Sequence, residues 1–447
     1  MKTPFTRTPL LIRAALGTAL LAAAAHATPP EGSPYTVPQP AFFGQVRPRT
    51  ELDHKALSDT SANKSLLSTH VRTRLGFVAT PSLNVEIKVE FQDTRVFGTE
   101  PGSAAAPHTA STGNLKGLDL LQGYVAVQEG PIKTVLGRQK MQLGGGRFLS
   151  TLEWAPYSRA FDGVSANWSM ESGDLTAFSY LVADSTNSTT GTAQTKPATE
   201  DRLLLSGIYY NRKINDMLTA EAGLFHDQSR LLTVYSGDSS TRYDLVTASE
   251  RVLGKFNIFA FEEEFLYQTG KMHHKVSRDV AAWQLAVRAG IVLPKLKANV
   301  GVDAMSGDDD QTDHDYNTYR ANFYFSHAYF GWMDYFVANP RYGVVDYRAD
   351  VDALVWKGET RTASFKGQYH YFTPQNAPSN ADKPYGQEVD AELHLGLYPK
   401  SNIVIGAGMF LPGDGAYKLA GAVAKLTSAA QNTSPAYFFY FMPTFNF

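Results

Sequence analysis

The sequence predicts an all-β fold: a transmembrane antiparallel β-barrel of about 18 strands, monomeric, with short periplasmic turns and long extracellular loops. Three observations support this prediction. Apolar and polar side chains alternate along segments throughout the chain. No run after residue 27 approaches the roughly 20 apolar residues that a spanning helix requires. Short and long polar connections follow one another between the alternating segments.

The alternation has a period of two, which places successive side chains on opposite faces of a strand. Between residues 83 and 92 one face carries only apolar side chains and the other only polar ones. The same pattern recurs at residues 345–353 and 388–395. An antiparallel sandwich with one wet face also alternates in this way. Strands of about ten residues, repeated this often, favour the barrel.

Turn residues set the strand count. Tight polar or Gly/Pro breaks, expected to be periplasmic turns, occur at Thr80–Ser82, Glu129–Pro131, Glu171–Gly173, Asn211–Asp216, Leu253–Lys255, Leu293–Lys295, Lys357–Glu359 and Tyr398–Lys400. Longer connections, expected to be extracellular loops, include Gly98–Gly117, Ser185–Glu200, Gly307–Thr318, Pro374–Pro384 and Gly413–Ser434. Eight hairpins, with one strand before them (41–51) and one after (436–447), give about eighteen strands, enough to enclose an aqueous lumen.

The two ends of the chain carry export and assembly signals. Lys2, Arg7 and Arg13 precede an apolar stretch and the small-x-small sequence Ala25-His26-Ala27, which predicts a signal peptide over residues 1–27 and a barrel domain over residues 28–447. The aromatic residues that alternate up to Phe447 resemble the C-terminal strand that the barrel-assembly machinery recognises in Gram-negative outer-membrane proteins. Pro443 departs from that pattern, because it cannot donate to the ladder.

Composition and motifs exclude other classes. The signal peptide would remove three of the 41 basic residues and none of the 43 acidic ones, so nucleic acid is not an expected partner. The chain has no cysteine, and no catalytic motif or cofactor-binding loop is present. His273-His274 and the acidic residues from Asp308 to Asp315 are interpreted as solvated loop residues rather than metal ligands, although the acidic loop leaves Ca²⁺ open.

Several short motifs occur in order along the mature chain: Leu136–Lys140, Gly144–Phe148, Trp154, Arg159–Val164, Gly331–Phe336, Gly386–Asp390 and Gly406–Phe410. Together they resemble the alginate export family of outer-membrane proteins, over a span from about residue 68 to the end. The resemblance implies an eighteen-stranded barrel that exports a polyuronate through an electropositive constriction.

The resemblance also points to Arg138, Arg147, Arg159 and Asp162 as pore-lining residues. A planar guanidinium group can pair bidentately with a carboxylate. Several arginines in series would let an anion move from one guanidinium to the next. A structural ion pair between Arg159 and Asp162, anchoring a loop inside the barrel, is the alternative.

Alternation predicts further lumen-facing charges of both signs. The basic ones are Arg72, Arg74, Lys88, Arg288, Lys297 and Arg348, and the acidic ones are Glu86, Glu90, Asp303, Asp346, Asp350, Asp352, Glu388, Asp390 and Glu392. Of these, Arg72, Arg74, Lys88, Asp346, Arg348 and Asp390 are, with the four residues above, the predicted pore-lining set. Because basic residues dominate the early strands and acidic ones the late strands, the sequence predicts an electric field across the pore.

The first functional hypothesis is a passive outer-membrane channel for a hydrophilic, anionic polysaccharide of the alginate type or a related solute. The second is a general or solute-specific diffusion porin for small molecules. An outer-membrane enzyme would need a Ser/His or Asp/His group that no strand shows. Residues 326–339, rich in aromatics within the longest expected loop, either fold inward to cap the mouth or pack at the outer aromatic girdle.

Overall fold

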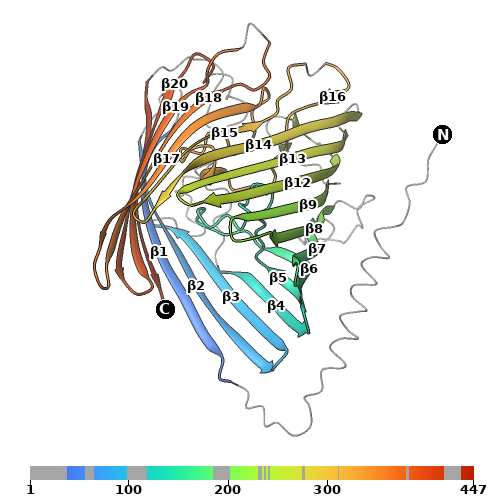
Figure 1. Cartoon of the computed structure of the whole chain (residues 1–447), viewed down its shortest axis with the longest axis vertical. Coiled ribbons are helices and arrows are strands. Elements are labelled where there is room, and N and C mark those ends of the chain that lie inside the picture. The colour runs from blue at the N-terminus through green and yellow to red at the C-terminus, as the bar shows by residue number, and fades with distance from the viewer. Residues whose placement is uncertain are drawn as a thin grey trace, which may run out of the picture.

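The protein is described by a computed structural model that covers residues 38–55, 65–97, 118–184, 202–229, 234–235, 238–239, 242–273, 277–310, 312–378, 382–416 and 434–447. Within these ranges, 18 long antiparallel strands close into one barrel (Figure 1). The predicted fold class is therefore confirmed. The wall strands are β1 (Ala41–His54), β2 (Leu66–Ser82), β3 (Val85–Val96), β4 (Asp119–Glu129), β5 (Ile132–Gln139), β6 (Phe161–Met170), β7 (Gly173–Asp184), β8 (Arg202–Lys213), β9 (Leu218–Ser229), β12 (Arg242–Phe256), β13 (Phe259–His273), β14 (Ser277–Leu293), β15 (Leu296–Met305), β17 (Val344–Lys357), β18 (Thr362–Thr373), β19 (Gly386–Tyr398), β20 (Ser401–Pro412) and β21 (Ala436–Asn446).

Four short elements complete the described secondary structure. The two-residue strands β10 (Val234–Tyr235) and β11 (Asp238–Ser239) pair with each other, and β16 (Asp315–Tyr316) lies parallel on β14. A single turn of 3₁₀ helix, η3, spans Ser326–Ala328. No helix in the described ranges is long and apolar enough to cross a membrane.

The first and last strands close the barrel. β1 pairs with β2 on one side and with β21 on the other. The β1–β21 ladder is interrupted between Val46↔Phe445 and Thr50↔Phe441, where the register sets Pro48 opposite Pro443. Neither proline has an N–H to donate, so the two share one gap in the ladder. The last strand therefore accommodates Pro443, which departs from the usual C-terminal pattern, at this gap near its end.

Six of the eight predicted turns lie where the sequence places them, and two are displaced along the chain. β2 continues to Ser82, past an irregularity after Ala79, so the turn falls at Leu83-Asn84. β12 continues to Phe256, and Asn257 takes the turn with φ 55°. Gly254 lies inside β12 rather than in the turn, and a Cβ there would collide with the ring of Phe261.

The two faces of the wall differ as the alternation predicts. On the outer face apolar side chains are exposed, as at Phe91, Val389 and Phe439. On the inner face polar side chains are buried, as at Glu90 and Gln92 of the same strand. The side chains are buried because connections between strands fold into the lumen (Figure 1).

Some predicted features lie outside the described residues. These are the signal peptide at residues 1–27, the loops at 98–117 and 185–200, the larger part of the loop at 413–434, and His274. His273 is the last residue of β13, and its Nδ1 lies 3.2 Å from the Ser277 hydroxyl at the start of β14.

Candidate functional site: the charged lumen

Two connections between strands lie inside the barrel and pack against its inner face. The first inner segment, residues 140–160, joins β5 to β6, and the second inner segment, residues 306–343, joins β15 to β17. They contact each other, because Ser150 N donates to the Phe323 carbonyl at 3.0 Å and Leu149 pairs with Phe323 in an isolated bridge. Since residues 326–339 pack on inward-facing side chains such as Phe372 and Phe410, the inward-folding alternative is the one that the structure supports.

Three arginines surround the carboxylate of Asp303 on β15. Arg147 of the first inner segment donates to Oδ1 at 2.9 Å, and Arg348 of β17 reaches Oδ2 at 3.2 Å. Arg288 of β14 donates to Oδ2 as well. Asp303 and Arg147 are both fully buried. Because a buried ion is costly unless it is paired, this carboxylate ties the first inner segment to two strands of the wall.

The same network continues toward the neighbouring strands. Arg147 lies 3.3 Å from Glu264 of β13, and its guanidinium stacks over the Tyr329 ring at 3.7 Å from the centroid. Glu264 lies 3.5 Å from Arg251 of β12, which also pairs with Glu221 and Glu262 at 2.9 and 3.0 Å. Arginines and carboxylates from both inner-segment and wall positions therefore form one continuous network of ion pairs.

A second, more basic cluster lies on β1 and β2. Arg47 and Arg49 donate to the carbonyls of Glu153 and Trp154 at 2.7 and 2.6 Å. Arg72 and Arg74 reach the Glu153 carboxylate at 3.3 and 3.0 Å. All four arginines are buried under the first inner segment, so Glu153 and backbone carbonyls neutralise a sector of wall that would otherwise be strongly positive.

A third, acidic cluster on β17–β19 holds the second inner segment. The Glu388 carboxylate accepts the Met333 N–H at 2.8 Å, and Asp390 accepts the Trp332 N–H at 3.3 Å. Gly331, with φ 80°, precedes them, and a Cβ there would lie 2.4 Å from the Glu388 carboxylate. Only glycine fits this close approach at a positive φ.

In the same cluster His370 of β18 bridges two acids. Its Nδ1 lies 2.8 Å from Asp346, and its Nε2 lies 3.8 Å from Asp390. All three side chains are buried. Asp346 and Asp390, both predicted to face the pore, are buried on the inner side of the wall, where Asp346 pairs with His370 and Asp390 accepts from the second inner segment.

The basic and acidic clusters lie on neighbouring sectors of the wall rather than on opposite sides, and the electric field across the pore stays a prediction. Ring closure leaves only β20 and β21 between β19 and β1. At this boundary the Trp154 ring stacks on His327 at 3.8 Å, and Arg49 lies 4.5 Å from the Trp154 centroid. The first and last strands are far apart in the sequence, but closure of the barrel makes them neighbours.

Arg138 and Asp162 do not line the pore, and this prediction is wrong. They share the outer face with the exposed Leu136 and Trp168 on the same strands. Arg138 Nη1 donates to Asp162 Oδ2 at 2.8 Å, directly across the β5–β6 ladder. The alternative pair of Asp162 with Arg159 is not the one that forms, since Asp162 points outward and pairs with Arg138.

Arg159 and Lys88 remain on the inner side. Arg159 donates to the carbonyls of Ser150 and Phe323 and so joins the two inner segments. The Lys88 ammonium lies 5.0 Å from the Phe43 ring centroid, near the periplasmic end of β3. Sequence reasoning missed Arg47, Arg49 and Arg251 as site residues, although alternation in their strands would have placed all three on the inner face.

The acidic loop Asp308–Asp315 uses its carboxylates locally. Asp310 accepts the Thr312 N–H at 2.8 Å, and Asp309 accepts the Asn376 amide at 3.1 Å. Among the described residues no group of three or more His, Asp or Glu side chains is arranged to hold a metal ion.

Charge pairing shifts the ionisation of the inner segments. Burial raises the pKa of Glu153, but Arg74, Arg72 and Lys140 outweigh it and lower this pKa from 4.5 to about 2. Burial lowers the pKa of Arg147, but Asp303, Tyr329 and Glu264 raise it above its usual value. Both groups stay charged at neutral pH, as the ion-pair networks require.

Substitution of Asp303 tests the three-arginine cluster. We expect Asp303→Asn to destabilise the barrel by about 3–5 kcal/mol, the usual cost of removing one partner of a buried ion pair. The measurement is the temperature at which the folded barrel loses its compact mobility on a denaturing gel. Glu359→Gln, in the exposed β17–β18 turn, is the control. A shift no larger than that of the control would contradict a stabilising role for Asp303.

Acid should loosen the first inner segment through Glu153. Because the folded pKa of Glu153 is depressed, its contribution to stability is complete above about pH 4.5 and is lost as the pH falls toward about 2. We therefore expect the thermal stability of the wild type to fall across this window more steeply than that of Glu153→Gln. Exposed Glu171→Gln serves as the matched control. Equal slopes in wild type and Glu153→Gln would refute the assignment.

Comparison with known proteins agrees with this architecture. Among solved structures, the chain is similar to a BenF-like porin from Pseudomonas fluorescens Pf-5, with a TM-score of 0.60, 9% identity, and 92% of this chain and 98% of that chain covered. It is also similar to OccAB1 of Acinetobacter baumannii, with a TM-score of 0.57, 10% identity, and 91% and 96% covered. The outer membrane protein OprD of Pseudomonas aeruginosa gives a TM-score of 0.51, 11% identity, and 91% and 93% covered.

At these identities the likeness concerns the fold. No curated protein matches the chain. The family model for alginate export matches residues 41–339, which is more than half of the sequence. The motifs that resemble this family, the closed barrel and this match agree: the chain belongs to the alginate export family of outer-membrane β-barrel proteins.

Proposed function

We propose that this barrel is a passive channel for an anionic polysaccharide of the polyuronate type, which crosses the outer membrane from the periplasm. The observation that carries the proposal is the continuous chain of arginines and carboxylates from Arg251 through Arg147 to Arg348. Each arginine already pairs with a carboxylate of the protein. A uronate carboxylate can replace that partner, so a polymer can move from one arginine to the next without a deep trap.

A diffusion porin for small hydrophilic solutes is the second candidate. Its support is the degree to which the inner segments fill the lumen with buried aromatic side chains, among them Phe323, Tyr324, Phe330 and Phe336. A lumen narrowed in this way suits a small solute without further movement. A polymer would require the second inner segment to shift from its contacts on Glu388 and Asp390.

The proposal includes the export route of the chain itself. Residues 1–27 would act as a cleavable signal peptide, and the strand that ends at Phe447 would be recognised by the barrel-assembly machinery before insertion into lipid. Its support is the residue pattern at each end and the pairing of the last strand with the first.

The two candidates separate in a planar bilayer. We expect polymannuronate to block single-channel current through the wild type. Arg251→Gln should weaken the block several-fold, up to about tenfold if the lost contact contributes about 1.4 kcal/mol. In the matched control Arg138→Gln, which changes the outer face, polymannuronate should block the current as strongly as in the wild type. A large conductance without polymer block, and with saturable block by a small sugar or acid, would support the small-solute porin instead.

A further inference from the structure

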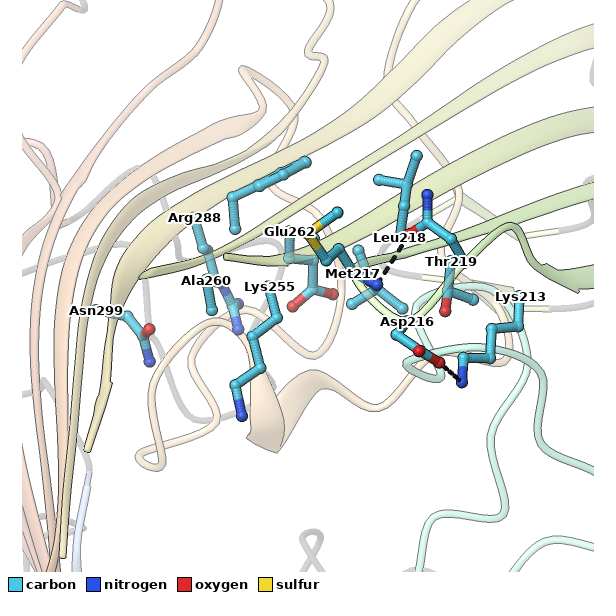
Figure 2. A pocket seen from close by; sticks show the side chains of 14 residues that line it. Lys213, Asp216, Met217, Leu218, Thr219, Lys255, Ala260, Glu262, Arg288 and Asn299 are labelled. Atoms are coloured by element: carbon cyan, nitrogen blue, oxygen red, sulfur yellow. Dashed lines mark hydrogen bonds and ion pairs between the residues drawn. The ribbon is translucent and has the colours of Figure 1, made fainter. Parts of the chain in front are cut away.

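A cavity lies at the periplasmic end of the lumen, below the Asp303 network. Its volume is about 370 Å³, within the range of sites that hold small molecules. The lining comes from the β8–β9 turn, the end of β12 and the walls β13 to β15 (Figure 2). Its polar lining residues are Lys213, Asn215, Asp216, Thr219, Lys255, Glu262, Arg288 and Asn299.

Most charges in this lining are already paired. Lys213 pairs with Asp216 at 2.6 Å. Glu262 accepts from Arg251 at 3.0 Å, and Arg288 donates to Asp303. Lys255 differs, because within the described parts of the chain it has no ion-pair or hydrogen-bond partner for its ammonium. Figure 2 shows Lys255 extended into the open space of the cavity.

Lys255 lies on the inner face of the barrel wall. Lys255 follows Arg251 and Leu253 at spacings of two along β12, and Arg251 faces the lumen through its contacts with Glu221 and Glu264. An orientation toward the lumen makes a sugar substrate, rather than a lipid headgroup, the accessible source of a negative charge. Asn299, on the same face of β15 as Asp303, adds an amide that can donate a hydrogen bond.

We propose that this cavity is a carboxylate-binding subsite at the periplasmic entrance, which takes one uronate unit of the polymer. Lys255 provides the counter-ion, Asn299 donates to the same sugar, and Arg288 lies at the cavity wall as the next cation toward the Asp303 network. The subsite rests on the proposed function and deepens it, because it names the residue that first meets the anionic substrate and the side from which the substrate enters.

Because the proposed subsite lies at the periplasmic entrance, its effect should depend on the side of the membrane to which the sugar is added. Trimannuronate is added to one side of a bilayer at a time, and the association rate of current block is measured for wild type, Lys255→Gln and Lys255→Arg. We expect Lys255→Gln to lower the rate about 3- to 10-fold from the periplasmic side only, and Lys255→Arg to restore it. Lys357→Gln, an exposed lysine of another periplasmic turn that does not line the cavity, is the matched control.

Equal periplasmic block in wild type and Lys255→Gln would overturn the subsite. A second measurement separates this failure from failure of the proposed function. Glucuronate binding to the detergent-solubilised barrel is measured by calorimetry, for wild type and Lys255→Gln. If trimannuronate never blocks the wild type but glucuronate binding depends on Lys255, the polymer channel is wrong and the carboxylate subsite stands. If glucuronate binding is the same in both proteins, the subsite is wrong.

Discussion

The buried carboxylate of Asp303, on the inner face of β15, is shared by three guanidinium groups. A barrel wall that alternates apolar and polar residues must place its charges inside, and buried charges are tolerated only when they are paired. The inner segments supply the missing partners: Arg147 for Asp303, Glu153 for the arginines of β1 and β2, and two backbone amides for Glu388 and Asp390. The inward fold of these loops is therefore a consequence of the charge pattern on the wall.

This arrangement gives the lumen two properties that a plain wide pore lacks. Its interior is divided into a basic and an acidic sector that meet at the Trp154–His327 stack, and residues of the inner segments pair with the charges of both sectors. The first inner segment is also held to the wall by ion pairs. Under the proposed function, a substrate that carries carboxylates exchanges with the carboxylates of the protein, whereas a neutral polymer has nothing to exchange.

The sequence predicts the wall well and the constriction poorly. Period-two alternation determines the inward face of a strand, which is why Asp303, Asp346 and Arg348 were placed correctly. Arg138 lies two residues from the exposed Leu136, so alternation predicts the outer face for it, whereas the family motif predicts the pore. Glu153 lies in a connection without periodicity, so only the folded chain shows that it meets arginines from two strands.

The most direct test of the account is whether residues 326–339 lie inside the barrel in a membrane. The chain has no native cysteine, so a single introduced thiol reports its own exposure to a charged, water-soluble reagent. Met333→Cys, buried against the acidic cluster, should react far more slowly than Asp309→Cys, which is exposed in the same connection. Equal reaction rates would show that the second inner segment does not occupy the lumen, and the account of a charge-built constriction would be wrong.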